Sequence, residues 1–305
     1  MERIFPPLPQ KGDRVALFAP SYWVDEDTVK RAWKVLSQMG FIVVVPEQLQ
    51  QRQGQVGGTV AQRANTLHQL FQDEEIKAVF AIRGGYGALQ LLDHLDYNLL
   101  KAHPTAFIGS SDSTALLNAI YARTGLVGYH GPMFGSMPHR EHLDPQTLSS
   151  LQVVLNGGNH VNLDSEAQPV QRARSISGTL IGGNARVFDQ LIGTPYFPQD
   201  ESIILMLEDV NEKVNELDKN FLHLKHAGIL PYVQGVIIGE VGLFDDNAEQ
   251  PFGMAVSEIL QRYLPNDIPL VCNVSCGHGK KILTTPIGAK VVLDVTAVSS
   301  HISWE

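Results

Sequence analysis

The first half of the chain alternates short apolar runs with helix-like segments, and this order constrains the fold more than any other feature. Apolar runs predict strands over 14–19, 41–45, 76–82 and 105–109, and the segments between them predict helices over 25–40, 60–72, 87–92 and 112–123. Strands that alternate with helices form a parallel sheet with helices on both faces. We therefore predict a flavodoxin-like parallel-sheet α/β domain over residues 1–150.

The remaining residues predict a second, smaller domain. With 305 residues the chain exceeds one typical domain. The pattern loosens after residue 146, and we predict a linker over 151–176. Strands are predicted at 179–181, 202–207, 233–238 and 270–274, helices at 185–191, 214–227 and 255–263, and a terminal strand pair at 291–295 and 297–302. This mixture predicts a mixed α/β domain over 177–305.

Charge and composition exclude several classes of protein. The formal net charge is −9 and no block of Lys or Arg occurs, which argues against nucleic acid or an anionic membrane as a partner. No signal-peptide core or membrane-spanning stretch is present, so we expect a cytoplasmic protein. Cys272 and Cys276 make neither a disulfide framework nor a zinc site and are expected to pack in the core. No cofactor or metal is expected.

One strand-to-helix junction has the pattern of a nucleophile elbow. The apolar run 105–109 ends at Gly109, Ser111 follows, and a helix-like segment begins at once. A serine on such a turn projects towards a substrate with the N–H groups of the new helix nearby. The usual G-x-S-x-G form is not met, because Ser113 replaces the last glycine. Ser111 is therefore either a nucleophile or a helix cap.

Two further polar residues follow apolar strands. Glu208 comes after the run 202–207, and His278 lies between Gly277 and Gly279 after the run 270–274. Glu208 alone could stabilise a helix N-terminus, and His278 alone could be a turn residue. With Ser111 they supply a nucleophile, an orienting carboxylate and a base, which is the set that a serine hydrolase needs.

A glycine-rich loop at 83–87 follows the third predicted strand. Its glycines allow backbone N–H groups to face a developing oxyanion. A phosphate cradle is the alternative, although the Gly-Lys-Ser/Thr of a P-loop and the G-x-G-x-x-G pattern are both missing. Arg83 offers a cation for a substrate carboxylate, or else forms a structural ion pair between the domains.

These motifs together resemble a known family. The sequence contains, in order, Arg-Gly-Gly-Tyr-Gly at 83–87, Gly-Ser-Ser-Asp at 109–112, Gly-Pro-Met at 131–133, Gly-Gly-Asn at 182–184, Gly-Thr-Pro at 193–195, Leu-Glu-Asp-Val-Asn-Glu at 207–212 and Gly-His-Gly at 277–279. In this order and from end to end, the chain resembles the LD-carboxypeptidases, also called muramoyltetrapeptide carboxypeptidases, whose relatives include the microcin C immunity peptidases.

The resemblance implies a serine peptidase with its active site between the two domains. The implied roles are nucleophile for Ser111, orienting carboxylate for Glu208, general base for His278, and oxyanion donors for the backbone N–H groups of Gly85 and Asp112. Arg83, Gly84 and Tyr86 are expected to contact substrate.

The implied reaction is hydrolysis of the L–D amide bond that releases the terminal D-Ala from murein tetrapeptides during peptidoglycan recycling. The alternative is hydrolysis of peptidyl or aminoacyl nucleotide antibiotics. We expect a homodimer whose only other partner is a small muropeptide.

Some residues depart from the family pattern or suggest a different chemistry. Ser110 stands where an aromatic residue or His is usual, and Glu216 and Lys219 stand where arginines are common. If Glu216 faces the cleft, it favours an ammonium group on the substrate. The histidine pairs at 139/142 and 223/226 invite a metal site, but the H-E-x-x-H pattern is absent and we expect ordinary surface or partly buried histidines.

Overall fold

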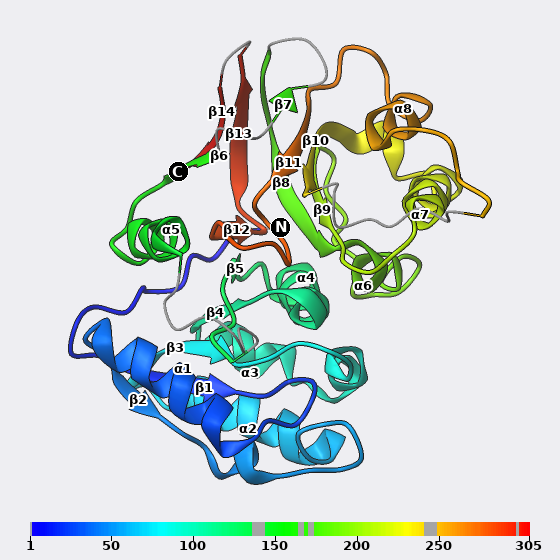
Figure 1. Cartoon of the computed structure of the whole chain (residues 1–305). Helices are drawn as coiled ribbons and strands as arrows, with labels where there is room; N and C mark the ends of the chain where they lie inside the picture. The colour runs from blue at the N-terminus through cyan, green and yellow to red at the C-terminus, as the bar shows by residue number, and fades with distance from the viewer. Residues whose placement is uncertain (1, 136–143, 164–167, 170–173, 241–248, 297–298) are drawn as a thin grey trace.

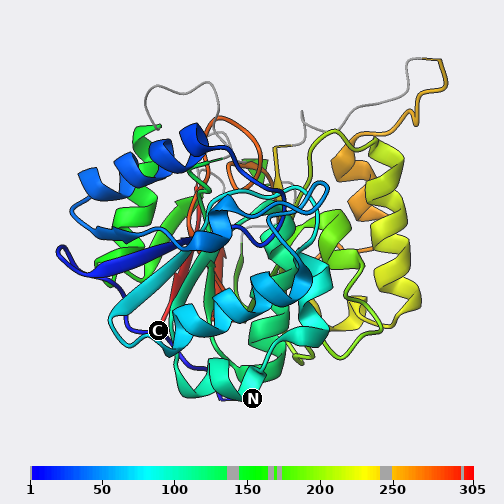
Figure 2. The same ribbon diagram turned by 90° about the horizontal axis from the view of Figure 1, so that it is seen from below.

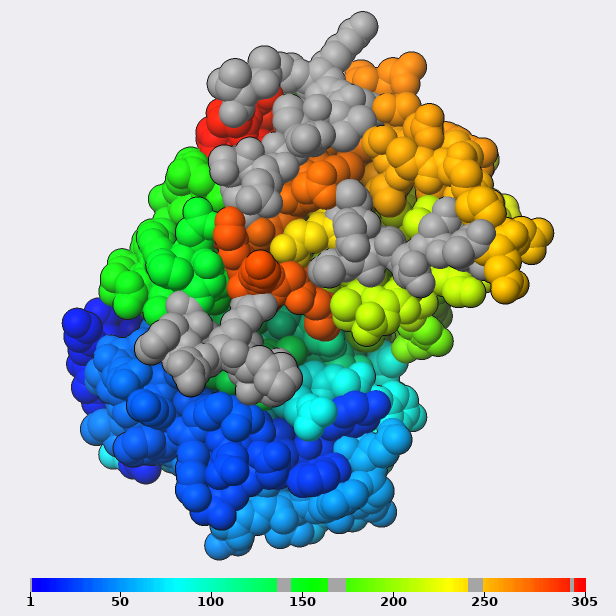
Figure 3. All heavy atoms as spheres, viewed as in Figure 1, coloured from blue at the N-terminus to red at the C-terminus, as the bar shows by residue number. Residues whose placement is uncertain are grey.

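Two β-sheets organise the chain. The computed structural model describes residues 2–135, 144–163, 168–169, 174–240, 249–296 and 299–305. In this part of the chain, one sheet has the strand order β12-β5-β4-β3-β1-β2 and the other has the order β6-β14-β13-β8-β9-β10-β11-β7. Figure 1 shows the first sheet with its helices below the second, and the space-filling view shows the two lobes in contact (Figure 3).

The first sheet confirms the predicted parallel α/β arrangement. Its parallel strands are β1 (Arg14–Phe18), β2 (Ile42–Val44), β3 (Ile76–Ala81), β4 (Ala106–Gly109) and β5 (Gly128–His130). The four residues of β4 are all buried, as expected for a strand covered on both faces. Sequence patterning missed β5, because only three residues of it are extended.

Helices cover both faces of this sheet. The helices are α1 (Glu26–Gln38), α2 (Val60–Gln72), α3 (Tyr97–Ala102) and α4 (Thr114–Thr124), and the 3-10 segments are η1 (Glu47–Gln50), η2 (Ala88–His94) and η3 (Ser111–Ser113). Figure 2 shows α1 on one face and α2 on the opposite face. The predicted helix at 87–92 is therefore a 3-10 segment, and the one at 112–123 is divided between η3 and α4.

The second sheet is mixed, as predicted. Its parallel strands are β8 (Arg174–Asn184), β9 (Ile203–Glu208), β10 (Val233–Gly239) and β11 (Leu270–Val274), and the antiparallel ones are β6 (His160–Leu163), β7 (Gln168–Pro169), β13 (Lys290–Val295) and β14 (Ser300–Trp304). The helical segments beside it are α6 (Ala185–Asp189), α7 (Val214–His226), η4 (Leu230–Tyr232) and α8 (Val256–Gln261).

The predicted linker contains regular structure. Residues 151–176 include the end of α5 (Pro145–Leu155) and strands β6 and β7 of the second sheet. In β6 only Val161 and Leu163 are buried while His160 and Asn162 are exposed, so too few apolar residues mark it as a strand. The domain limits at 150 and 176 stay a prediction.

One strand from the C-terminal half of the chain belongs to the first sheet. β12 (Thr285–Ile287), from the C-terminal half, pairs antiparallel with β5 and so joins the first sheet. A strand of three residues carries no periodic signal that would assign it to either sheet. The crossing brings the segment that holds His278 close to the carboxyl end of the first sheet.

A buried contact between α4 and β8 fixes one sheet against the other. The Asn118 side chain donates to the Gly182 carbonyl at 2.8 Å and accepts from the Gly182 N–H at 3.1 Å. Thr114 Oγ1 accepts from the Asn184 N–H at 2.9 Å. A Cβ on Gly183 would lie 2.4 Å from Thr114 Oγ1, so only glycine allows β8 to approach this closely. Because α4 follows Ser111, this contact sets the position of Ser111 relative to the second sheet.

Candidate active site

Ser111 lies in a strained turn at the end of β4. Its φ is +53°, a left-handed conformation that a serine rarely adopts. Gly109 makes the tight turn possible, because a Cβ there would lie 2.8 Å from the Ala81 Cβ and 2.9 Å from the Ser113 Cβ. Strain of this kind costs about 1–3 kcal/mol and is concentrated at functional sites. The geometry is that of a half-buried serine at a strand-to-helix elbow.

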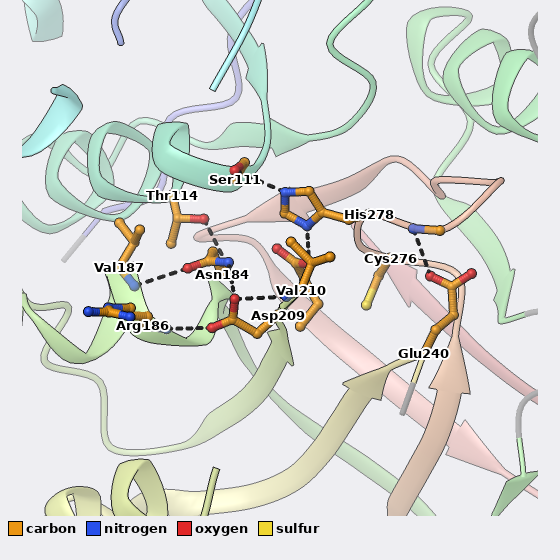
Figure 4. A network of polar contacts seen from close by, with 12 residues as sticks. Ser111, Thr114, Asn184, Arg186, Val187, Asp209, Val210, Glu240, Cys276 and His278 are labelled. Carbon is orange, nitrogen blue, oxygen red and sulfur yellow. Dashed lines mark hydrogen bonds and ion pairs between the residues drawn. The ribbon is translucent and has the colours of Figure 1, made fainter. Parts of the chain in front are cut away.

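Ser111, His278 and Glu208 form one hydrogen-bonded chain between the two sheets. His278 Nε2 lies 3.0 Å from Ser111 Oγ (Figure 4), and Nδ1 lies 2.8 Å from Glu208 Oε2. Glu208 is 1% exposed, whereas Ser111 is half-buried and the His278 side chain is 29% exposed. The three residues singled out in the sequence therefore meet, and the Ser111 and His278 side chains are accessible to solvent.

Glycine makes room for the carboxylate. A Cβ on Gly277 would lie 2.4 Å from Glu208 Oε2, and one on Gly239 would lie 2.7 Å from the Glu208 Cβ. Glycine on the N-terminal side of His278 is therefore required by the close approach of Glu208. On its other side, the Gly279 N–H donates to Glu240 Oε2 at 3.1 Å (Figure 4).

The surroundings of His278 favour its protonated form. Burial disfavours the imidazolium, but the hydrogen bond and negative charge of Glu208, together with the charges of Asp209 and Glu240, outweigh it and raise the pKa of His278 above its usual value of 6.5. Since Glu208 accepts at Nδ1, the neutral ring carries its proton there, and Nε2 is left as an acceptor towards Ser111.

His130, which sequence reasoning missed, lies buried beside this chain. Its side chain is fully buried, and Nε2–H donates to the Cys276 carbonyl at 2.6 Å. Burial lowers the pKa of His130, so its ring is neutral there, although Glu208 opposes the shift. The contact connects β5 to the segment before His278. Cys272 and Cys276 are both buried, as expected for packing residues, and burial raises the pKa of the Cys272 thiol to about 12.

A second buried network holds the strand ends beside Glu208 (Figure 4). Asn184 Nδ2 donates to Asp209 Oδ1 at 2.9 Å, and Asn184 Oδ1 accepts from the Val187 N–H at 3.1 Å. Asp209 Oδ2 accepts from the Arg186 N–H at 3.1 Å. Burial raises the pKa of Asp209, while its hydrogen bonds to Val210, Asn184 and Arg186 oppose the shift. The Gly-Gly-Asn motif at 182–184 contains Asn184 and was the feature of the sequence that could have pointed to this network.

The glycine-rich loop lies directly against Ser111. A Cβ on Gly84 would lie 2.9 Å from Ser111 Oγ, and Gly85 has φ +113° with the Tyr22 ring beside it. The two predicted oxyanion donors, the N–H groups of Gly85 and Asp112, therefore belong to the two segments that meet at Ser111. Their role stays a prediction.

A cleft of about 470 Å³ opens beside Ser111 and is of the size of a small-molecule site. It is lined by Tyr22, Asp25, Thr28, Arg31, Arg83, Gly84, Gly85, Ser111, Met133, Gly135, Val210 and His278. Among the described residues, Arg83 makes no interdomain ion pair; its guanidinium lies over the Tyr22 ring and donates to the Trp23 carbonyl at 3.4 Å.

Tyr86, an expected substrate contact, and Glu216 do not line this cleft. Tyr86 is 52% exposed, lies outside the residues that line the cleft, and accepts a hydrogen bond from Gln90. Glu216 accepts from Lys219 Nζ at 2.6 Å and lines a separate hollow between α6 and α7. Glu216 therefore does not face the cleft beside Ser111, and the prediction of an ammonium group on the substrate, which depended on that position, is withdrawn.

The histidines considered as metal ligands have other surroundings. His223 Nδ1 lies 2.8 Å from Asp189 Oδ1 on the surface of α7. Across the described residues, no group of three or more His, Cys, Asp or Glu side chains is placed to hold a metal ion. His139 and His142 lie outside the described residues. In the described part of the chain no helix combines the length and the apolar character needed to cross a bilayer.

A serine on a strained elbow, a histidine and a buried carboxylate in one hydrogen-bonded chain form an arrangement that serine hydrolases of several unrelated folds use. Residues 15–131 match the LD-carboxypeptidase N-terminal domain, and residues 177–293 match the LD-carboxypeptidase C-terminal domain. The chain therefore belongs to the LD-carboxypeptidase family.

Individual relatives agree with this assignment. The murein tetrapeptide carboxypeptidase of Pseudomonas aeruginosa is 30% identical, with 92% of this chain and 93% of the relative covered. The microcin C7 self-immunity protein MccF of Escherichia coli is 26% identical, with 93% and 91% covered. The crystal structure of a MccF-like protein from Bacillus anthracis aligns with a TM-score of 0.87 at 27% identity and covers 99% of both chains.

Proposed function

We propose that the chain is a serine-type LD-carboxypeptidase that removes the terminal D-Ala from murein tetrapeptides through a Ser111–His278–Glu208 triad. The observation that carries the proposal is the continuous chain of two hydrogen bonds, 3.0 and 2.8 Å long, from the serine hydroxyl to the buried carboxylate. The name of the Pseudomonas aeruginosa relative supports the choice of substrate.

In the proposed reaction Ser111 Oγ attacks the carbonyl carbon of the amide bond before D-Ala. His278 Nε2 takes the hydroxyl proton, and Glu208 stabilises the imidazolium that forms at Nδ1. The tetrahedral intermediate then collapses: the C–N bond breaks, and the same proton passes to the D-Ala amine. A water activated by His278 hydrolyses the acyl-enzyme and regenerates Ser111.

The developing oxyanion needs donors close to Ser111. We assign this role to the backbone N–H groups of Gly85 and Asp112, the second of which directly follows the nucleophile, as in other elbows. Gly84 supports the assignment because its backbone lies against Ser111, where a Cβ would lie 2.9 Å from Oγ. Preorganised donors of this kind stabilise charge that is present only in the transition state.

A carboxypeptidase must also recognise the free carboxylate of its substrate. Arg83 and Arg31 both line the cleft. A guanidinium binds a carboxylate through paired hydrogen bonds. The packing of Arg83 over Tyr22 leaves it without an ion-pair partner among the described residues, which supports Arg83 as the group that binds the terminal carboxylate.

The test is incubation of the purified protein with L-Ala-γ-D-Glu-meso-diaminopimelate-D-Ala, followed by mass spectrometry. We expect free D-Ala and the tripeptide from the wild type and neither from Ser111→Ala. An aminoacyl-sulfamoyl adenylate is the matched competitor, because MccF is also a relative. Cleavage of that compound without release of D-Ala would replace the murein assignment by the nucleotide-antibiotic one.

Two accompanying proposals concern the protein in the cell. We propose that it acts in the cytoplasm on recycled muropeptides and that it is a homodimer. Fractionation of cells that express the chain tests the cytoplasmic location. Sedimentation velocity tests the homodimer, since a monomer at micromolar concentration would contradict it.

A further inference from the structure

Arg63 is a buried cation outside the cleft that the proposed mechanism does not use. It lies on α2 with a relative exposure of 0%, and the hydrogen bonds that its guanidinium makes to described residues go to carbonyl and amide oxygens and not to a carboxylate. Arginine keeps its charge in proteins, so every N–H must find an acceptor. The acceptors of these N–H groups therefore indicate which segments Arg63 holds in place.

The guanidinium binds backbone carbonyls from separate loops. Nη1 donates to the Pro20 carbonyl at 2.5 Å and to the Gly87 carbonyl at 2.9 Å. Nε donates to the Gly58 carbonyl at 3.2 Å, and Nη2 donates to Gln90 Oε1 at 2.7 Å. Pro20 follows β1 and Gly87 follows β3, so one side chain connects two loops at the carboxyl edge of the first sheet.

The Asp112 carboxylate binds the same two loops through their donors. Asp112 Oδ2 accepts from Ser21 Oγ at 2.5 Å and from the Ala88 N–H at 2.8 Å. Ser21 directly follows Pro20, and Ala88 directly follows Gly87. Each loop is thus held on its carbonyl by Arg63 and on the neighbouring donor by Asp112, the residue after the nucleophile.

This double attachment fixes the end of the 84–87 turn. Gly87 has φ +130°, and a Cβ there would lie 2.9 Å from Arg63 Nη1, so the backbone approaches the guanidinium as closely as only glycine allows. Gly85 stands two residues before this anchor, and Gly84 packs against Ser111. Displacing Gly87 therefore displaces the proposed oxyanion donor relative to Ser111 Oγ.

We propose that Arg63 is a positioning residue for the oxyanion hole: by holding the Pro20 and Gly87 carbonyls, it sets the distance between the Gly85 N–H and the nucleophile. The inference rests on the proposed function. Arg63 touches no reacting atom, and it acts on the transition state through the backbone of the 84–87 turn.

The first test compares Arg63→Lys and Arg63→Met with the wild type in the D-Ala release assay. A lysine keeps the charge but cannot reach four acceptors in a fixed plane, so Lys should retain more activity than Met. For Arg63→Met we expect kcat to fall about 10²-fold, because a misplacement of about 1 Å costs that much. KM should stay within about threefold, since the donor acts mainly on the transition state.

A tetrahedral analogue separates positioning from a purely structural role. We expect the affinity for a boronic acid analogue of the tetrapeptide to fall with kcat, while the affinity for the product tripeptide stays unchanged. Thr124→Val is the matched control, because the buried Thr124 hydroxyl donates to the Ile120 carbonyl and accepts from the Leu126 N–H, away from the Pro20 and Gly87 loops. It should lower the unfolding temperature and leave kcat unchanged. If Arg63→Met likewise lowered the unfolding temperature and left kcat unchanged, the inference would be overturned.

If the Arg63 variants do not fold, Ser21→Ala tests the attachment of the same loops. This substitution removes the hydrogen bond that the Ser21 hydroxyl donates to Asp112. We expect a kcat roughly tenfold lower at unchanged KM, and an unchanged kcat would contradict the proposal. Amide hydrogen exchange of residues 84–88 gives a readout without catalysis. If the wild type is inactive but Arg63→Lys exchanges faster than the wild type at these amides, the proposed function is refuted and the anchoring of the turn by Arg63 stands. If the wild type is active but Arg63→Lys changes neither the exchange nor kcat, the anchoring is refuted.

Discussion

Replacement of Glu208 by Gln tests the proposed triad most directly, because it removes a charge and almost no volume. Glu208 Oε2 accepts from His278 Nδ1 at 2.8 Å, and this bond keeps Nε2 free to take the Ser111 proton. A Gln amide can present NH₂ to Nδ1, which moves the ring proton to Nε2. The histidine then faces Ser111 with a hydrogen and no longer acts as a base.

We expect kcat of Glu208→Gln to fall by roughly 10³–10⁴, as for the equivalent change in other serine triads. This corresponds to about 4–5.5 kcal/mol of lost transition-state stabilisation. KM should change little, because Glu208 does not line the cleft. The fold should persist: Glu208 is 1% exposed, and its Oε1 has no hydrogen-bond partner among the described residues, so losing the buried charge is not costly.

The assay is steady-state release of D-Ala, with the unfolding temperature measured on the same samples. Glu212→Gln is the control, because Glu212 is the next carboxylate of the same motif and pairs with the exposed Arg186. It should behave as the wild type. If Glu212→Gln were inactive and Glu208→Gln active, the orienting carboxylate would be Glu212 and the reasoning would be refuted.

Other substitutions and conditions separate the remaining roles. Ser111→Ala should lower kcat by several orders of magnitude with intact folding, whereas Ser110→Ala should stay active; the reverse would move the nucleophile by one residue. Because the base must be neutral and the pKa of His278 is raised, kcat/KM should rise with pH through a midpoint above 6.5. In Glu208→Gln the pKa of His278, followed by NMR titration of the ring, should fall. A flat activity profile of the wild type from about pH 5 to 8 would argue against His278 as the base. Arg83→Ala should raise KM for the tetrapeptide about tenfold or more, with little change for a substrate amidated at its C-terminus; equal losses on both would exclude carboxylate binding. Gly183→Ala, at φ +126° and against α4, should lower the unfolding temperature and kcat together in calorimetry and the D-Ala assay, and a wild-type result would show that the domain contact tolerates a methyl group.

The local pattern of the chain predicts four of the six strands in the described part of the first sheet, and it singles out Ser111, Glu208 and His278. Buried parallel strands are continuous apolar runs, so β1, β3 and β4 were visible, and the polar residue after each run marked a sheet edge where ligands gather. Ser111, Glu208 and His278 each follow such a run within a few residues. Short strands escaped because three residues, as in β5 and β12, contain no period.

Only the tertiary structure decided how these residues meet. Ser111 and His278 are 167 positions apart, and their approach depends on the fit of β8 against α4 and on β12 joining the first sheet. The same holds for Arg63, whose partners lie on loops that no helix periodicity connects to it. The tertiary structure also places Glu216 at a separate hollow, so the sequence argument for an ammonium group on the substrate does not hold. Sequence patterns report the burial of single elements, whereas contacts between elements arise from packing that is specified jointly by distant residues.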